Sequence, residues 1–424
     1  MFARLHSNTK GFLKFFSQKT GLDGIYLARG GFWSSFSFVV NSSIALVSVI
    51  AFANLLPADV YGQYKYILSL GGIFAVFSLT GMNTAVTQAV AQGHDNTYRY
   101  AVRYQIYWNM LVVIASTLVA VYYVFEHNWL LAIGVFIIGV TFPFTAAYNT
   151  FGSYLLAKRE FGRLTLYTSI SSFLNVAPLV TVLFVTHNVL ALVATYAVAG
   201  LLPNIFFHFY VLHLFKPSKA RLKTEEKASI KYGAHLSILT SFSNIAANID
   251  KVILFHYLGA IQVAIYSLAT SIPNRIGGYM KTVGVTILPK LANRSLTEIS
   301  GVFYKRVLQT LLLGLAISLS YVLAAPFIFK YLLTKYLASV NYSRVLSIAF
   351  IFQATGNYVG NVFRAHKIIS AAYVASVQTL LRIALYIIMG VYWGIWGIVW
   401  ATVSMQIVGF FVSLLIWEYE KRRL

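Results

Sequence analysis

The chain has 424 residues, of which 58% are hydrophobic and only 10% are charged, and its mean hydropathy is +0.71. Because about a quarter of the residues of a soluble domain are charged, this composition excludes a soluble protein and predicts an all-α polytopic membrane protein. The absence of cysteine excludes disulfides, thiolate metal sites and cysteine nucleophiles. A formal charge of +22 is also found in nucleic-acid-binding proteins, but here the basic residues lie in alternate gaps between apolar runs, so we predict no nucleic-acid partner.

A helix needs about 20 apolar residues to cross the hydrocarbon core of a bilayer. Runs of this kind predict about twelve transmembrane helices, at 30–54, 65–91, 104–125, 129–156, 165–187, 189–214, 233–257, 262–288, 304–325, 342–364, 369–390 and 393–416. Of the 33 basic residues, 25 lie in the N-terminal segment, in the loops after even-numbered spans and in the C-terminal tail. The positive-inside rule then places both termini in the cytoplasm.

The segment before the first span, residues 1–29, is basic and contains "GFLKFFSQKTGL". Its mixture of phenylalanine and lysine is typical of an amphipathic helix on the membrane surface, and a disordered basic anchor is the alternative. The last residues, 417–424, form a second basic cytoplasmic segment.

A short repeat divides the chain into two halves. "LPADVYGQYKY", which starts at Leu56, aligns without a gap with "LGAIQVAIYSL", which starts at Leu258, at an offset of 202 residues. We therefore predict a six-helix lobe at 30–214, a cytoplasmic loop at 215–231 and a second six-helix lobe at 232–416. Transporters built from such parallel repeats place the substrate path between the halves, so a central cavity is expected there.

The seventh predicted span contains two adjacent charges, Asp250 and Lys251, in "SNIAANIDKVILFHYLG". Such a charge at membrane depth costs at least ~2.5 kcal/mol. Adjacent side chains on a helix point ~100° apart, so we expect each residue to meet a partner on another helix. A gate, coupling to H⁺ or Na⁺, and a fixed packing bridge are the three alternatives for this pair.

Three further cations lie inside predicted spans. Arg275 and Arg382 are expected near the midplane, and Lys281 is expected toward the cytoplasm. Because an arginine cannot lose its charge by deprotonation, and no acid within the spans pairs with both arginines, these residues predict a cationic substrate-binding cavity. The other basic residues on the external side, such as Lys65, are expected to be solvated or to snorkel.

Polar residues at helical spacing should face the interior of the bundle rather than lipid. Such stripes occur in spans 7 and 10 and, more weakly, in span 1. The cavity-lining residues that they predict are Asn41, Ser241, Asn244, Asn248, Gln353, Asn357 and Asn361. The alternative is that these side chains join helices by hydrogen bonds.

The sequence contains no HExxH, P-loop or GxSxG motif, and its predicted external loops are short with few acids. We therefore predict that the chain is not an enzyme and holds neither a metal nor a cofactor.

Three long stretches resemble the polysaccharide-unit (O-antigen type) flippases of the multidrug/oligosaccharidyl-lipid/polysaccharide exporter superfamily. They are "LPADVYGQYKYILSLGGIFAVFSLTGMNTAVTQAVAQG" (56–93), "NIDKVILFHYLGAIQVAIYSLATSIPNRI" (248–276) and "LLTKYLASVNYSRVLSIAFIFQATGNYVGNVFRAHK" (332–367). The resemblance implies two lobes in a V around a central cavity, and alternating access. It also implies transfer of undecaprenyl-diphosphate-linked oligosaccharide from the cytoplasmic to the outer leaflet of the bacterial plasma membrane, for surface polysaccharide synthesis together with the polymerase machinery.

Two alternatives come from the same superfamily. An ion-coupled multidrug or cation antiporter would need buried acids in spans 1–6, and the sequence offers none that is convincing. Lipid II flippases often have fourteen spans, whereas twelve are predicted here. A cationic cavity suits a diphosphate, since arginine binds phosphate oxygens in a bidentate manner.

Overall fold

The computed structural model describes residues 24–218, 224–285, 291, 294–366 and 368–422, and this part of the chain is helical with no strand. The first half contains α2 (Gly24–Leu55), α3 (Ala58–Phe74), η1 (Ala75–Phe77), α4 (Met82–Ala91), α5 (Asn96–Phe125), α6 (Trp129–Tyr148), α7 (Phe151–Ala157), α8 (Phe161–Val185) and α9 (Val189–Phe215). The second half contains α10 (Thr224–Ala246), α11 (Ile249–Leu258), α12 (Ala260–Val285), α14 (Leu296–Leu332), η2 (Thr334–Tyr336), α15 (Ser339–Ser347), α16 (Ala349–Ala365) and α17 (Ile369–Lys421).

The fold confirms an all-α polytopic membrane protein. Seven helices in the described residues are long and apolar enough to cross a membrane, or eight if the bent pair Ala58–Phe77 and Met82–Ala91 is one span. The count of twelve stays a prediction, because several predicted spans are interrupted or polar. Spans 7 and 10 are each broken into two helices, and spans 11 and 12 are both contained in α17, whose helical path is broken at Gly394 with φ 58°.

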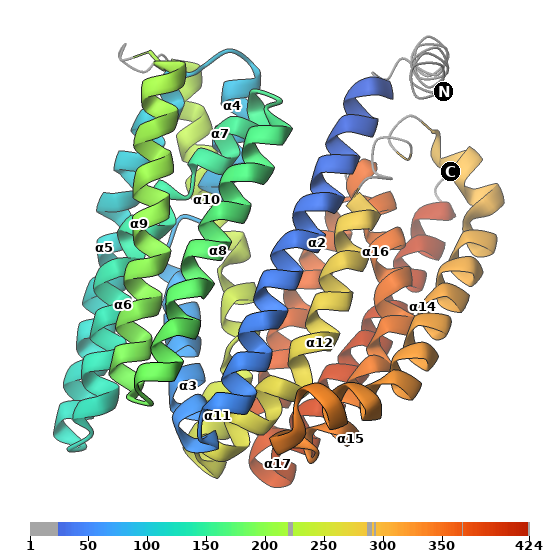
Figure 1. The fold of residues 1–424 in the computed structure, drawn as a ribbon. Coiled ribbons are helices and arrows are strands. Elements are labelled where there is room, and N and C mark those ends of the chain that lie inside the picture. Colours follow the sequence, from blue (N-terminus) through green and yellow to red (C-terminus); the bar gives the residue numbers. More distant parts are fainter. Residues whose placement is uncertain (1–23, 219–223, 286–290, 292–293, 367, 423–424) are drawn as a thin grey trace, which may run out of the picture.

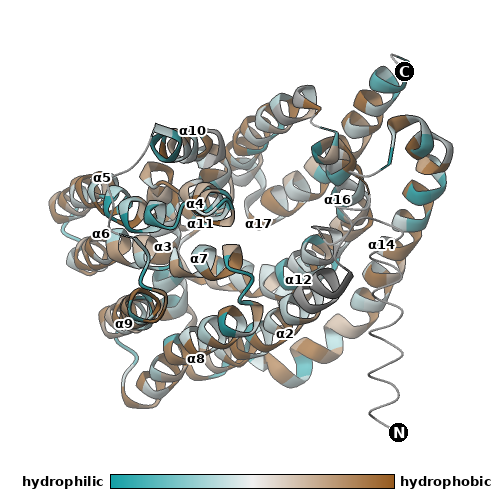
Figure 2. Ribbon diagram, turned by 90° about the horizontal axis from the view of Figure 1, so that it is seen from above, coloured by the Kyte–Doolittle hydropathy of each residue, from teal (hydrophilic) through white to brown (hydrophobic). Residues whose placement is uncertain are grey.

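The helices form two groups that come together at the end of the molecule opposite the termini and separate toward the termini (Figure 1). The largest buried apolar cluster contains residues of both groups, from Phe52 and Tyr61 in the first half to Leu268 and Phe329 in the second. Viewed along the helices, α2 lies beside both α8 and α12 (Figure 2). The largest apolar contact between the two halves lies at that end, and α10 of the second half also packs against α4 of the first.

Many large apolar side chains on the outer helices are exposed, among them Leu312, Leu323 and Phe327 on α14. Hydrophobic residues cover much of these helices in Figure 2. In water such a surface would be an aggregation liability, but a bilayer is as apolar as these side chains. The outward faces therefore fit a lipid environment.

The repeated segments occupy equivalent places in the two halves. Each follows the end of a helix, and Ala58 begins α3 as Ala260 begins α12. Tyr64 and Tyr266, which the alignment pairs, are both buried. The second half of the expected loop 215–231 is helical, since α10 begins at Thr224 with two acids in its first turn, where the helix dipole favours negative charge. The predicted amphipathic segment lies almost entirely outside the described residues.

Candidate functional site

A cluster of three cations, which we call the cationic cluster, lies where the two halves meet. Lys65 on α3, Lys251 on α11 and Arg275 on α12 stand on three helices that pack against one another, and the charges of Lys251 and Arg275 act on Lys65. The Nζ atom of Lys65 lies 5.3 Å from the ring centre of Tyr61 and 5.8 Å from that of Tyr64, so two aromatic faces contribute to holding it. Lys65 is half-buried, so it is not the fully solvated side chain that was one of the two expectations for it.

Arg275 contributes an incompletely bonded guanidinium to this cluster. Its Nε atom is buried and has no hydrogen-bond partner in the described part of the chain, and no described acid forms an ion pair with it. A buried donor without a partner is costly, so this arginine is suited to receive hydrogen-bond acceptors from a ligand.

Asp250 and Lys251 pair with each other, which corrects the expectation that each would meet only a partner on another helix. The Nζ atom of Lys251 lies 3.2 Å from Oδ1 of Asp250, and the backbone N–H of Lys251 donates to the same oxygen at 2.8 Å. The helix is broken just before them, because Asn248 separates α10 from α11, and the long lysine side chain folds back onto the first turn. The other carboxylate oxygen does meet another helix, since Tyr266 of α12 donates to it at 2.8 Å.

Arg382 and Lys281, the other two predicted cavity cations, are not part of this cluster. Arg382 lies on α17, and its Nε atom is buried without a partner among the described residues. Lys281 lies further along α12 than Arg275 and is exposed. The electrostatic partners of Lys65 are therefore Lys251 and Arg275, and the sequence could not identify this set because it depends on how α3 crosses α11 and α12.

The polar stripe of span 7 packs against the break between α3 and α4. Ser237 accepts a hydrogen bond from the Gly81 backbone N–H at 2.9 Å, and Ser241 donates to the Val76 carbonyl at 3.0 Å. Asn244 donates to the Ala75 carbonyl at 3.4 Å. These side chains bond to backbone groups at the helix break, so the stripe joins the two halves by hydrogen bonds.

The remaining residues of these stripes also lie at helix–helix contacts. Asn248 lies against Gly72 of α3, and Gln353 lies against Gly277 of α12. Asn361 donates to the Gly284 carbonyl at 2.8 Å, while the Nδ2 atom of its neighbour Asn357 is buried and has no partner among the described residues. Most of the predicted cavity-lining residues thus connect helices.

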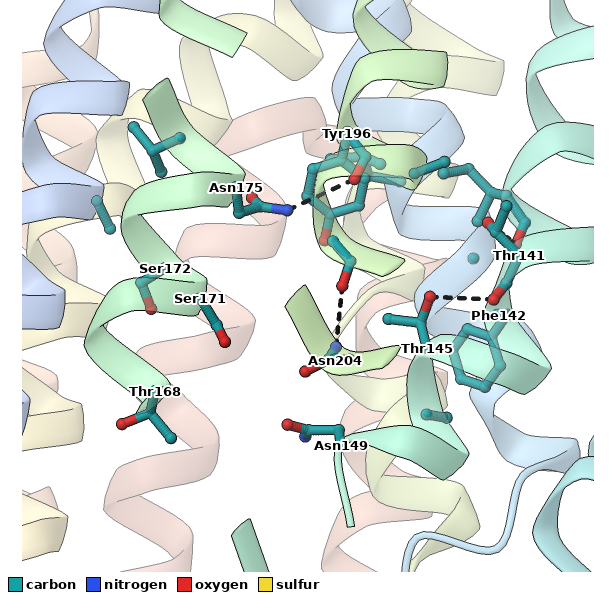
Figure 3. A pocket seen from close by; sticks show the side chains of 18 of the residues that line it. Thr141, Phe142, Thr145, Asn149, Thr168, Ser171, Ser172, Asn175, Tyr196 and Asn204 are labelled. Atoms are coloured by element: carbon teal, nitrogen blue, oxygen red, sulfur yellow. Dashed lines mark hydrogen bonds between the residues drawn. The ribbon is translucent and has the colours of Figure 1, made fainter. Parts of the chain in front are cut away.

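A pocket of about 610 Å³ lies within the first half of the chain and is lined by residues of α2, α3, α6, α7, α8 and α9. We call it the neutral pocket, because none of its lining residues in the described chain is charged. Its polar lining residues are Asn41, Thr141, Thr145, Asn149, Thr168, Ser171, Ser172, Asn175, Tyr196 and Asn204. Figure 3 shows the hydroxyl and amide groups of α8 facing those of Asn149 and Asn204 across the space.

Of the predicted site residues, only Asn41 lines the neutral pocket. It also lines an adjoining space of about 320 Å³ that reaches Thr282 of α12. The sequence contained a signal for three more of the lining residues, since Thr141, Thr145 and Asn149 recur every four residues in the same way as the stripes of spans 7 and 10. In the described residues no group of three or more histidine, aspartate or glutamate side chains is placed to hold a metal.

Known proteins resemble this chain in sequence and in fold. A family model described as "Polysaccharide biosynthesis protein" matches residues 27–295, which is more than half of the chain. A Shigella flexneri protein described as a candidate O-antigen transporter is 22% identical over 351 residues, covering 77% of this chain and 82% of that protein.

Solved structures of the MOP superfamily share the fold at low sequence identity. Lipid II flippase MurJ in an inward closed conformation has a TM-score of 0.69 at 14% identity, over 90% of this chain and 86% of that chain. An inward-facing multidrug resistance transporter of the MATE family has a TM-score of 0.64 at 17% identity, over 90% of this chain and 96% of that chain. The chain therefore belongs to the polysaccharide biosynthesis protein family and has the fold of the MOP superfamily.

Proposed function

We propose that the chain is a flippase for undecaprenyl-diphosphate-linked oligosaccharide units, which it moves from the cytoplasmic to the outer leaflet of a bacterial plasma membrane. Its family and its relative in Shigella flexneri support a role in polysaccharide transport. The cationic cluster is the observation that carries the choice of substrate, because three positive groups and an unpartnered guanidinium Nε suit a diphosphate.

In this proposal the diphosphate binds between the two halves. Lys65 approaches it from the first half of the chain, and Lys251 and Arg275 approach it from the second. Without an anion the three cations repel one another, so a bound diphosphate draws the halves together around it. The helices then alternate between a state closed at the end opposite the termini and a state closed at the other end, with both termini in the cytoplasm. The polymerase machinery would receive the unit at the outer leaflet.

An ion-coupled antiporter for cationic drugs is the weaker alternative. Such a protein needs an acid that is free to exchange a proton or a cation. Among the described residues, Asp250 is an acid within a predicted span. Its carboxylate already forms an ion pair with Lys251 and a hydrogen bond with Tyr266. We therefore propose that Asp250 orients Lys251 toward the substrate, and that any H⁺ or Na⁺ coupling acts through this pair.

Complementation of a strain that lacks its polysaccharide flippase tests the proposal. The chain is expressed with its own glycosyltransferases, and surface polysaccharide is measured for wild type, Arg275→Ala and Lys330→Ala. Lys330 is an exposed cation at the end of α14 and serves as the control. We expect Arg275→Ala to abolish surface polysaccharide and Lys330→Ala to retain it. Full activity of Arg275→Ala, or no rescue by the wild-type chain, would overturn the proposal.

A further inference from the structure

The neutral pocket contains polar atoms for which the protein itself supplies no partner. The Oδ1 atom of Asn41 and the Oγ atom of Ser171 are both buried and accept or donate no hydrogen bond within the described residues. Asn41 uses its other amide atom to donate to the Ser37 carbonyl at 2.7 Å, which fixes its side chain with Oδ1 left unpaired. Burying two such atoms at membrane depth is costly unless a ligand pairs with them.

The chemistry of the lining selects among ligand classes. A diphosphate or a uronic acid would need cations, and a cationic drug would need acids, but the described lining has neither. A purely apolar ligand would leave Oδ1 of Asn41 and Oγ of Ser171 without a partner. Serine and threonine hydroxyls both donate and accept, and asparagine amides do the same with separate atoms. This donor and acceptor pattern matches the hydroxyl and acetamido groups of an uncharged sugar.

The neutral pocket is also placed to continue from the cationic cluster. Leu68 and Gly72, which line the pocket, follow Lys65 by three and seven residues on α3 and therefore share one face of that helix. Lys65 and Gly72 are separated by about 10 Å along the helix axis, from a rise of 1.5 Å per residue. A ligand with a diphosphate at Lys65 can extend along this face into the neutral pocket.

We infer that the neutral pocket binds uncharged sugar residues of the lipid-linked substrate while the cationic cluster holds its diphosphate. This inference rests on the proposed function and adds a saccharide site to it. The volume of about 610 Å³, with the adjoining space of about 320 Å³ that shares Asn41, lies in the range of small-molecule sites and leaves room for more than one ring.

The test uses the absence of cysteine from the chain, which allows a single cysteine to be labelled without background. Ser171→Cys reports on the neutral pocket, and Asn204→Cys on the facing helix is a second reporter in case the first variant does not fold. The control is His187→Cys, which lies in the exposed turn between α8 and α9. Each full-length variant is placed in lipid nanodiscs and treated with a water-soluble maleimide.

Labelling rates are measured under three conditions: without ligand, in the presence of undecaprenyl diphosphate, and in the presence of undecaprenyl diphosphate that carries the host's own oligosaccharide. At a ligand concentration ten times Kd, we expect the glycolipid to slow labelling in the neutral pocket about tenfold, from the fraction of protein left free. Undecaprenyl diphosphate without sugar should leave that rate unchanged, and the rate at position 187 should not change with either ligand.

Binding of undecaprenyl diphosphate to wild type and Arg275→Ala is measured in the same nanodiscs. One outcome is that undecaprenyl diphosphate binds wild type more tightly than Arg275→Ala while the glycolipid fails to protect either pocket cysteine. In that case the saccharide site is wrong and the proposed function stands. If the sugar-free lipid protects the pocket equally well, the assignment of sugar to this pocket is also wrong. If neither lipid binds wild type, the proposed function fails and the saccharide site fails with it.

Discussion

Gly62 of α3 lies so close to Ala260 of α12 that a methyl group at Gly62 would be 1.8 Å from the Ala260 carbonyl oxygen. The two helices belong to different halves of the chain, and they cross at the end of the molecule opposite the termini (Figure 1). Only glycine at position 62 permits this crossing, so the closed end depends on a missing side chain.

Gly62→Ala should destabilise the conformation described here by about 1–3 kcal/mol, because backbone atoms must move to admit the methyl group. The expected result is a lower melting temperature of the purified protein. Gly301→Ala on α14 is the matched control, since a methyl group there meets no atom within 4 Å. Equal melting temperatures of the two variants would show that the crossing of α3 and α12 is not tight.

Ser237→Ala should weaken the contact between α10 and the break after α3. The change leaves the Gly81 backbone N–H without the acceptor it now has at 2.9 Å, at a cost of about 1–3 kcal/mol. Ser229→Ala on the same helix is the control, because Ser229 is half-buried and bonds only to the Glu225 carbonyl of its own helix among the described contacts. Thermal unfolding of the two variants measures the difference, and the idea fails if Ser229→Ala is equally destabilising.

Asp250→Asn should destabilise the protein because it leaves Lys251 charged and unpaired in a mostly buried place, where loss of one partner costs about 3–5 kcal/mol. Asparagine keeps the shape and can still accept from Tyr266. The double variant Asp250→Asn with Lys251→Met removes both charges and should recover most of the lost stability. A double variant no more stable than Asp250→Asn alone would mean that the ion pair does not determine the effect.

The same double variant separates stability from transport. If Lys251 binds the diphosphate, Asp250→Asn with Lys251→Met should fold and still export less polysaccharide than wild type. Surface polysaccharide in the complemented strain is the measurement, normalised to the amount of protein in the membrane. Wild-type export by this variant would remove Lys251 from the cationic cluster.

The sequence predicted the helical membrane fold well, because apolar runs and alternating basic loops follow directly from the bilayer. Of the two side-chain contacts of Asp250, the one with another helix was predicted and the one with Lys251 was not. A regular helix would point Asp250 and Lys251 apart, but the break at Asn248 and the flexible lysine chain allow them to meet, while Tyr266 supplies the expected contact from another helix.

The polar stripes were found but their partners were not. Ser241 and Asn244 contact carbonyl groups at Val76 and Ala75, and these carbonyls are within reach of α10 because α3 ends there. Hydropathy does not reveal such a break inside a long apolar run. The cationic cluster was missed for a similar reason, since Lys65 joins Arg275 through the crossing of two helices that are about half a chain apart.

The most direct test of the cationic cluster is the affinity of the full chain in nanodiscs for undecaprenyl diphosphate. Lys65→Ala with Arg275→Ala removes two of the three cations, and Lys330→Ala removes one that lies outside the cluster. Because a hydrogen bond to a charged group contributes about 1.5–3 kcal/mol, the double variant should bind at least about tenfold more weakly than wild type. An unchanged Kd in the double variant, or an equal loss in Lys330→Ala, would contradict diphosphate binding at this cluster.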